Sequence, residues 1–203
     1  MWADISITKK MSGKMENMQS QNNGFAASCY VRANDPDSPC HGCYSFRMMK
    51  RYENAKNRFQ KNTEAMNNVL LPNAALPRIN ASTFRFSAHG ELDNVIHARN
   101  SLRIAKYNLR TQFTLWTHDP KKVITAIEEE GGKPDNLILI YSSQKLNKID
   151  KKPLHFDKVF TCYTKDYVKN NTININCGEK KCFDCMTCYD KNNKTVQINE
   201  LMK

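Results

Sequence analysis

Residues 83–92 read TFRFSAHGEL, and this stretch decides the fold that the sequence predicts. Its first five residues alternate polar and apolar side chains as a short strand does, and its last five form the loop that leaves the strand. Asp93 or Asn94 then caps a helix that runs to about Tyr107. The stretch and its continuation therefore predict one βα unit.

The same alternation continues on the carboxyl side. A strand pattern at residues 112–117 precedes a helix that begins at Pro120 and stops at a Gly-Gly pair. Residues 137–141, LILIY, are typical of a strand buried on both faces, and residues 158–163 form a further strand. This order predicts an α/β fold, as an open parallel sheet or a partial (β/α) barrel. Functional groups are expected at the carboxyl ends of its strands, where the candidates are Cys29, His89, Glu91, His118, Ser142 and Ser143.

The amino side is less regular. Strand patterns occur at residues 4–8 and from about Phe25, and a broken amphipathic stripe predicts one long helix over residues 44–69. The chain from Thr172 onward is rich in Cys, Asn and Lys. We therefore predict an α/β domain over residues 1–171 and a small cysteine-rich lobe over residues 172–203.

Eight cysteines among 203 residues are the main chemical signal. The start has no apolar signal-peptide core, and no stretch of about 18 apolar residues occurs, so we expect a cytoplasmic protein with no membrane partner. In a reducing compartment cysteines favour metal binding or catalysis, although an even number also suits a secreted disulfide framework.

The tail holds four cysteines within twelve residues, in the pattern Cys-x4-Cys-x2-Cys-x2-Cys: Cys177, Cys182, Cys185 and Cys188. Thiolates spaced two apart can wrap successive corners of one iron-sulfur cluster. Structural zinc more often takes two Cys-x2-Cys pairs separated by a longer loop. The tail therefore favours a [4Fe-4S] cluster, with zinc as the alternative.

A second group, Cys29, Cys40 and Cys43, offers three thiols. A cluster held by three cysteines leaves one iron open to a small molecule. In the alternative interpretation, Cys29 is a buried apolar residue and the other two form half of a zinc site shared with the tail. His41 and Cys162 are candidate fourth ligands, although a lone cysteine in a strand is more typical of a core.

Gly90 and Glu91 form a candidate ligand contact. A glycine at a strand end lets a ligand approach the backbone, and the adjacent carboxylate can accept hydrogen bonds from an amine or a hydroxyl. A turn glycine followed by a solvated acid is the simpler explanation. His97, on the following helix, is expected at the surface.

The formal net charge of +11 suggests an anionic partner such as nucleic acid. Basic residues between Lys50 and Lys61 could form the contact face, or they could simply solvate a helix. Metal-bound thiolates would lower the charge by several units. The sequence has no Gly-rich phosphate loop, Gly-x-Ser-x-Gly elbow or His-Glu-x-x-His pair, which excludes those reaction classes.

Taken together, the three-cysteine group, residues 85–92 and the tail cysteines resemble a phage- and plasmid-borne family named after gene product 88. Its members resemble smaller relatives of radical S-adenosylmethionine proteins, with a strand, a three-cysteine loop and a helix followed by βα units. The resemblance implies that Cys29, Cys40 and Cys43 bind a cluster whose open iron takes S-adenosylmethionine, and that Gly90 and Glu91 lie beside this cofactor. It also implies the host cytoplasm.

The leading hypothesis is thus a protein with one or two [4Fe-4S] clusters that uses an electron donor for redox or radical chemistry, with enzyme activity left open. One rival is a zinc-stapled nucleic-acid-binding protein, and another is an iron-sulfur protein whose cluster is purely structural. The sequence leaves the substrate and the oligomeric state open.

Overall fold

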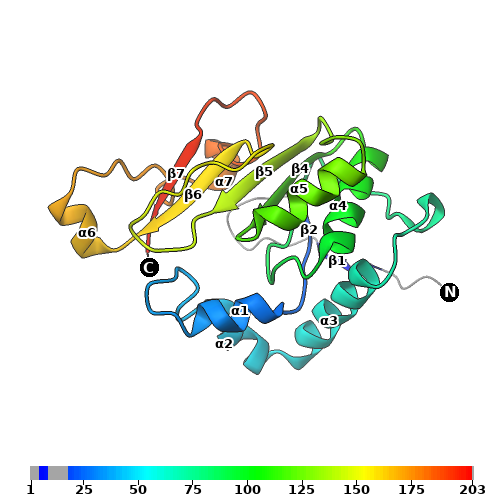
Figure 1. The fold of residues 1–203 in the computed structure, drawn as a ribbon, viewed down its shortest axis with the longest axis horizontal. Helices are drawn as coiled ribbons and strands as arrows, with labels where there is room; N and C mark the ends of the chain where they lie inside the picture. Colours follow the sequence, from blue (N-terminus) through cyan, green and yellow to red (C-terminus); the bar gives the residue numbers. More distant parts are fainter. Residues whose placement is uncertain (1–4, 9–17, 203) are drawn as a thin grey trace.

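The computed structural model describes residues 5–8 and 18–202 and has an α/β fold (Figure 1). Within these residues seven strands form one sheet in the order of the chain. The strands are β1 (Ile7–Thr8), β2 (Gln19–Gln21), β3 (Thr83–Phe86), β4 (Gln112–Thr117), β5 (Leu137–Ser142), β6 (Lys158–Tyr163) and β7 (Gln197–Leu201). The helices are α1 (Ala27–Ala33), α2 (Tyr44–Arg51), α3 (Glu53–Asn67), the 3-10 turn η1 (Asn73–Ala75), α4 (Val95–Tyr107), α5 (Pro120–Glu129), α6 (Lys165–Asn170) and α7 (Cys182–Cys185).

All neighbouring strands run parallel except β1, which pairs antiparallel with β2. A strand order that follows the chain is the order of a (β/α) barrel segment, because a doubly wound sheet reverses its order at a switch point. β1 and β7 form the two edges of the sheet, which is therefore open. The predicted parallel α/β architecture is confirmed.

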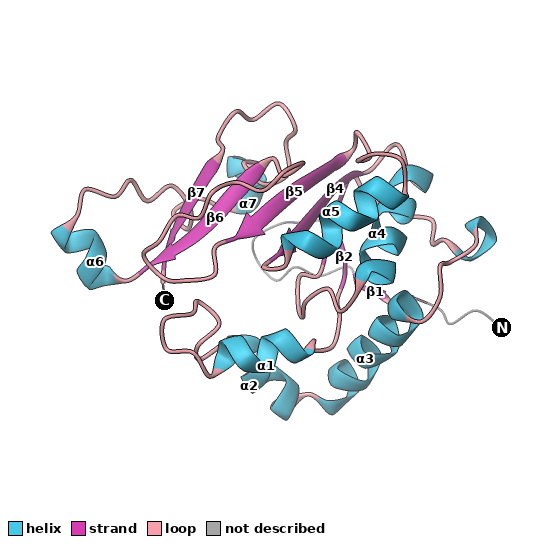
Figure 2. Ribbon diagram, in the orientation of Figure 1, coloured by secondary structure: helices cyan, strands magenta, loops and turns pink. Residues whose placement is uncertain are grey.

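The two faces of the sheet have different cover. On one face α4 and α5 pack over Leu137, Leu139 and Tyr141 of β5 (Figures 1 and 2). On the other face Ile138 and Ile140 pack with β7 and with cysteines of the tail. Every residue of β5 is buried, as its apolar sequence predicts.

Helix caps set the predicted βα boundaries. The side chain of Asn94 accepts a hydrogen bond from the backbone amide of His97 and starts α4, and Pro120 occupies the first turn of α5. β7 comes from the predicted cysteine-rich lobe and pairs with β6, so the tail supplies the last strand of the main sheet.

Two expectations on the amino side are wrong. The helix predicted over residues 44–69 is two helices, because Tyr52 leaves the helical region with φ −123° and ψ 82°. The strand expected near Phe25 lies earlier, at β2, where Gln19–Gln21 pair with β3, and α1 begins two residues after Phe25. Of the strand expected at residues 4–8, the described part pairs at Ile7–Thr8, and Asp4 lies outside the described residues.

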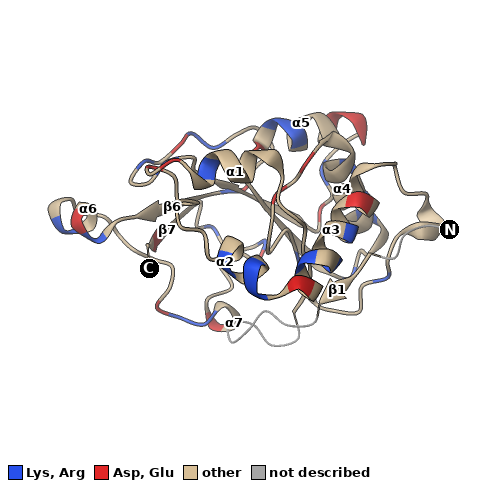
Figure 3. Cartoon of the chain, turned by 90° about the horizontal axis from the view of Figure 1, so that it is seen from below, with Lys and Arg blue, Asp and Glu red and all other residues tan. Residues whose placement is uncertain are grey.

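Lys and Arg residues lie on α2 and α3 (Figure 3). The five basic residues noted in the sequence are all exposed: Lys50, Arg51, Lys56, Arg58 and Lys61. No helix in the described part of the chain has the length and apolar character that crossing a membrane requires.

Candidate functional site

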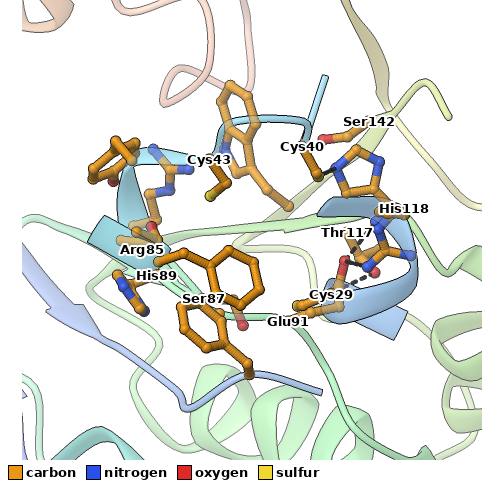
Figure 4. Close-up of a pocket in the computed structure, with 18 residues that line it drawn as sticks. Cys29, Cys40, Cys43, Arg85, Ser87, His89, Glu91, Thr117, His118 and Ser142 are labelled. Atoms are coloured by element: carbon orange, nitrogen blue, oxygen red, sulfur yellow. Dashed lines mark hydrogen bonds and ion pairs between the residues drawn. The ribbon is translucent and has the colours of Figure 1, made fainter. Parts of the chain in front are cut away.

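A cavity of about 230 Å³ lies at the carboxyl ends of β3 and β4, under the segment that carries α1 and α2 (Figure 4). It brings together eight of the candidate residues, namely Cys29, Cys40, Cys43, His89, Gly90, Glu91, His118 and Ser142. Carboxyl ends of parallel strands are where such sites are expected. The cavity is therefore the candidate site.

Local backbone structure presents the three cysteines. Cys29 belongs to α1, and Cys43 is the residue that caps α2. Between them, the amide of Cys40 donates to Ser38 Oγ at 3.2 Å, and the amide of Cys43 donates to the carbonyl of Cys40 at 3.1 Å. This turn lets two thiols face the cavity from one loop while the third comes from a helix.

Two of the cavity thiols, those of Cys29 and Cys40, are held in their neutral form. Burial raises the pKa of Cys29 to about 11, and the carboxylate of Glu91 raises it further. Burial also raises the pKa of Cys40, against the opposing charge of Arg32. A metal that binds here must displace these protons, as metal binding to thiols does in general.

Glu91 is a buried carboxylate that is already occupied. One oxygen accepts from the amide of Leu92 and from Thr117 Oγ1, both at 2.8 Å. The other accepts from the amide of His118 at 2.9 Å and lies 3.4 Å from Arg32. These four partners match the number of lone-pair sites on a carboxylate. Glu91 thus ties α1, β4 and the loop after β3 into one wall of the cavity.

The backbone at Gly90 requires a glycine, whether or not a ligand binds. Its φ is +79°, and an added Cβ would lie 2.3 Å from the carbonyl oxygen of Gly24 and 2.5 Å from that of Asn23. The neighbouring His89 and Asn23 join the two segments through a 2.9 Å hydrogen bond from the Asn23 amide to the His89 carbonyl. Only glycine fits this close approach of two backbones.

The sequence placed His118 at this edge of the sheet but gave it no role. Its Nε2 atom lies 3.5 Å from Cys40 Sγ (Figure 4). Burial lowers the pKa of His118 to about 3, and the charge of Arg32 lowers it further, so the imidazole is neutral. A histidine directly after a strand, at the edge where the cysteines meet, is the signal that could have identified it.

Arg85 and Trp116 were missed altogether. Both line the cavity, and the guanidinium carbon of Arg85 lies 4.5 Å from the centre of the Trp116 ring. Arg85 alternates with Phe84 and Phe86, which point into the opposite core. An arginine at an inward position of a buried strand is the available signal.

The tail cysteines form the second candidate group. Cys182 and Cys185 begin and end α7, and Cys188 packs with Cys177 against Ile138, Ile140 and Ile198. Burial raises the pKa of Cys188 to about 12, and the charges of Cys177, Cys182 and Cys185 raise it further. Cys177, Cys182 and Cys185 therefore each lie within electrostatic reach of Cys188.

The two candidate fourth ligands, Cys162 and His41, lie in different surroundings. Cys162 is half-buried rather than a core residue. Burial raises the pKa of its thiol to about 12, and the charges of Glu200, Cys40 and Cys177 raise it further. His41 is exposed, with Nδ1 3.2 Å from the carbonyl of Ala33. His97, expected at the surface, is fully buried.

The cysteines determine which metal groups the chain could hold. Among the residues that the structure describes, no three His, Cys, Asp or Glu side chains converge on a single ion. What the structure offers is three thiols around one cavity and four more gathered in the tail. Sulfur-only donors are chemically suited to iron-sulfur clusters and to zinc.

Comparison with curated proteins and with solved structures found no match in either set. One family does match. The sequence model of the family described as Gene product 88 aligns with residues 7–200, which includes both cysteine groups and the whole sheet from β1 to β6. The chain therefore belongs to the Gene product 88 family.

Proposed function

We propose that the chain is an iron-sulfur protein that performs redox or radical chemistry, with one cluster held by Cys29, Cys40 and Cys43 and a second by the four tail cysteines. The observation that carries this proposal is the cavity, because one thiol from α1 and two from the loop before α2 line the same space. When bound, the clusters would supply one-electron transfer.

The protein's own groups would prepare the site for this chemistry. Phe25 and Phe46 stack at 4.1 Å on the cavity wall and limit the access of water. Arg32 is mostly buried, with 12% of its side chain exposed, and its charge opposes the negative charge that thiolates bring. A low-dielectric wall with a fixed cation suits a site that gains and loses electrons.

S-adenosylmethionine is the proposed ligand of an open iron in the cavity, on the resemblance to radical S-adenosylmethionine proteins. Gly90 and Glu91 line the same space. Because Glu91 already has four partners, an amine could reach its carboxylate only by replacing one of them, and Arg32, at 3.4 Å, is the most distant. The proposed role of Glu91 is therefore to shape the pocket for this ligand.

The founding experiment is anaerobic purification followed by iron, sulfide and zinc analysis. We expect a brown protein with iron and acid-labile sulfide. The double variants Cys40→Ser/Cys43→Ser and Cys182→Ser/Cys185→Ser should each lose only the iron of their own site. Cys162→Ser serves as the matched control and should keep all of it. A colourless protein with stoichiometric zinc would refute the proposal.

The ligand is tested on the reduced protein. Electron paramagnetic resonance spectra should change when S-adenosylmethionine is added to wild type but not to the Cys40→Ser/Cys43→Ser variant. An unchanged wild-type spectrum, with no cleavage of S-adenosylmethionine under reduction, would leave a cluster protein without this cofactor.

A second candidate function follows from the exposed basic residues of α2 and α3 (Figure 3). In this alternative the cysteines hold zinc and these helices bind nucleic acid. Binding should then weaken steeply with salt and persist in protein without iron. Replacing Lys56, Arg58 and Lys61 with Gln should abolish the salt dependence if these residues contact phosphates.

A further inference from the structure

Arg85 occupies the space between the two cysteine groups. It lies on β3 opposite the face that carries the main core, since its neighbours Phe84 and Phe86 belong to that core. Its guanidinium carbon lies 4.5 Å from the centre of the Trp116 ring, in cation–π geometry. This stacking holds the guanidinium in one position, whereas an unstacked arginine side chain would adopt several conformations.

The guanidinium reaches the cavity and the tail at once. On one side it lines the cavity together with the three cysteines (Figure 4). On the other side its charge acts to lower the pKa values of Cys188 and Tyr189, against the burial that raises both. Tyr189 is buried and packs with Cys182 and Cys188, which are members of the tail group.

Trp116 belongs to the same junction. Its ring contacts Phe160 with a centroid distance of 4.8 Å, and both residues pack against the apolar cluster of Ile138, Ile140 and Ile198. Cys177 and Cys188 also pack against that cluster. A continuous packed layer therefore joins the cavity wall to the tail cysteines.

The charge of Arg85 is uncommitted. The other cavity arginine, Arg32, pairs with Glu91 at 3.4 Å. Within the described part of the chain Arg85 makes no ion pair with an acidic side chain, and its buried Nε atom has no hydrogen-bond partner. Arg85 is partly buried, and a cation held in the protein wall without an anion indicates that negative charge arises beside it in the loaded protein.

We propose that Arg85, held over Trp116, is a positioning residue that sets the reduction potentials of both clusters. The inference rests on the proposed function and extends it. Each reduction adds one electron from an external one-electron donor, here dithionite, and no covalent bond forms or breaks. The added negative charge is stabilised by a fixed cation, so the cation raises the potential of every cluster within its reach.

The test is a redox titration of the loaded protein, followed by electron paramagnetic resonance. Arg85→Met should lower both reduction potentials. At a fixed solution potential, the ratio of reduced to oxidised cluster should fall about tenfold, which corresponds to about 59 mV for a one-electron couple. Arg85→Lys, which keeps the charge, should recover much of the loss. Arg78→Met removes an exposed arginine before β3 and should change neither potential.

The outcomes separate the two proposals. If wild type holds no iron, the proposed function fails. If both clusters are present but Arg85→Met leaves either potential where it was, or Arg78→Met lowers both equally, the role of Arg85 is refuted. Should Arg85→Met lose its clusters, Arg85→Gln decides, since it keeps polar contacts without charge and is expected to lower both potentials.

Discussion

At the scale of single residues, the Gly90–Glu91 pair links the cavity to the backbone that builds it. Gly90 lets two chain segments approach, and Glu91 binds the groups that surround its carboxylate. Each residue that lines a cavity therefore has a measurable stability role beside any ligand role. The two roles can be separated by experiments on the protein without ligand.

Replacement of Gly90 by alanine should destabilise the fold strongly. The new Cβ would overlap two backbone carbonyl oxygens, and the φ of +79° adds strain. We expect a loss of at least about 3 kcal/mol in the free energy of unfolding, measured by urea denaturation. Gly131→Ala is the matched control, because Gly131 has φ +69° with open space around it and should cost about 1 kcal/mol. Equal losses in the two variants would contradict the close approach.

His97 should make the stability depend on pH. It is fully buried, and burial followed by the charge of Lys122 lowers its pKa from 6.5 to about 3. The unfolded chain therefore takes up a proton first when the pH falls, so this contribution is complete above about pH 6.5 and is lost between pH 6.5 and 3. The slope from this group is about 1.4 kcal/mol per pH unit.

The check is urea denaturation of wild type and His97→Leu across that pH window. In the variant, the free energy of unfolding should change less steeply with pH, by about 1.4 kcal/mol per pH unit. His155→Asn changes an exposed histidine and should retain the wild-type slope. Parallel pH profiles for wild type and His97→Leu would place the titration elsewhere.

The sequence predicted the members of the cavity better than their tasks. Residue type and spacing identify Cys29, Cys40 and Cys43, because three cysteines within fifteen residues are a signal that the sequence itself displays. Arg85 was missed, and His118 was placed at the right edge of the sheet without a role, because their importance comes from neighbours that are distant in the chain, such as Tyr189 and Cys40. A single sequence does not display such contacts.

At the scale of elements, the βα units were predicted with their boundaries because local signals agree. The cap at Asn94, the proline at residue 120 and the apolar run of β5 each act within a few residues. The break at Tyr52 was not predicted, because the sequence on both sides favours a helix. It depends on tertiary packing, with Phe46 of α2 stacked on Phe25 and Phe59 of α3 against His89.

Asn100 of α4 should prove essential for the docking of α3. Its side chain is fully buried, donates to the carbonyls of Met66 and Val69, and accepts from the amide of Leu71, each at 2.9 Å. Asn100→Ala leaves these three backbone groups without partners and should cost about 3 kcal/mol.

Thermal and urea unfolding measure this loss. The control is Asn170→Ala at the exposed end of α6, which should change stability by less than about 0.5 kcal/mol. A loss below about 1 kcal/mol for Asn100→Ala would mean that water replaces the three hydrogen bonds.

At the scale of the whole molecule, the sheet has a thick core on one face and a thin cover on the other. The α4–α5 face contains most of the buried apolar residues. The opposite face is closed by the tail, whose cysteines pack on Ile138, Ile140 and Ile198. Because the tail contributes only the short helix α7 and the strand β7, its closure should depend on what its thiols hold.

Removal of the metal that we propose for the tail should therefore open one face of the molecule and leave the other intact. We expect amides of residues 177–196 to exchange at least about tenfold faster after chelation, while amides of β5 and α4 stay protected. Binding of a hydrophobic dye should rise as the three isoleucines become accessible. The Cys182→Ser/Cys185→Ser variant should reproduce this state without chelator, and Cys40→Ser/Cys43→Ser should keep the tail protected. If chelation instead accelerates exchange in α4 and in the tail alike, the two faces unfold together, and the metal stabilises the whole sheet rather than its thin cover.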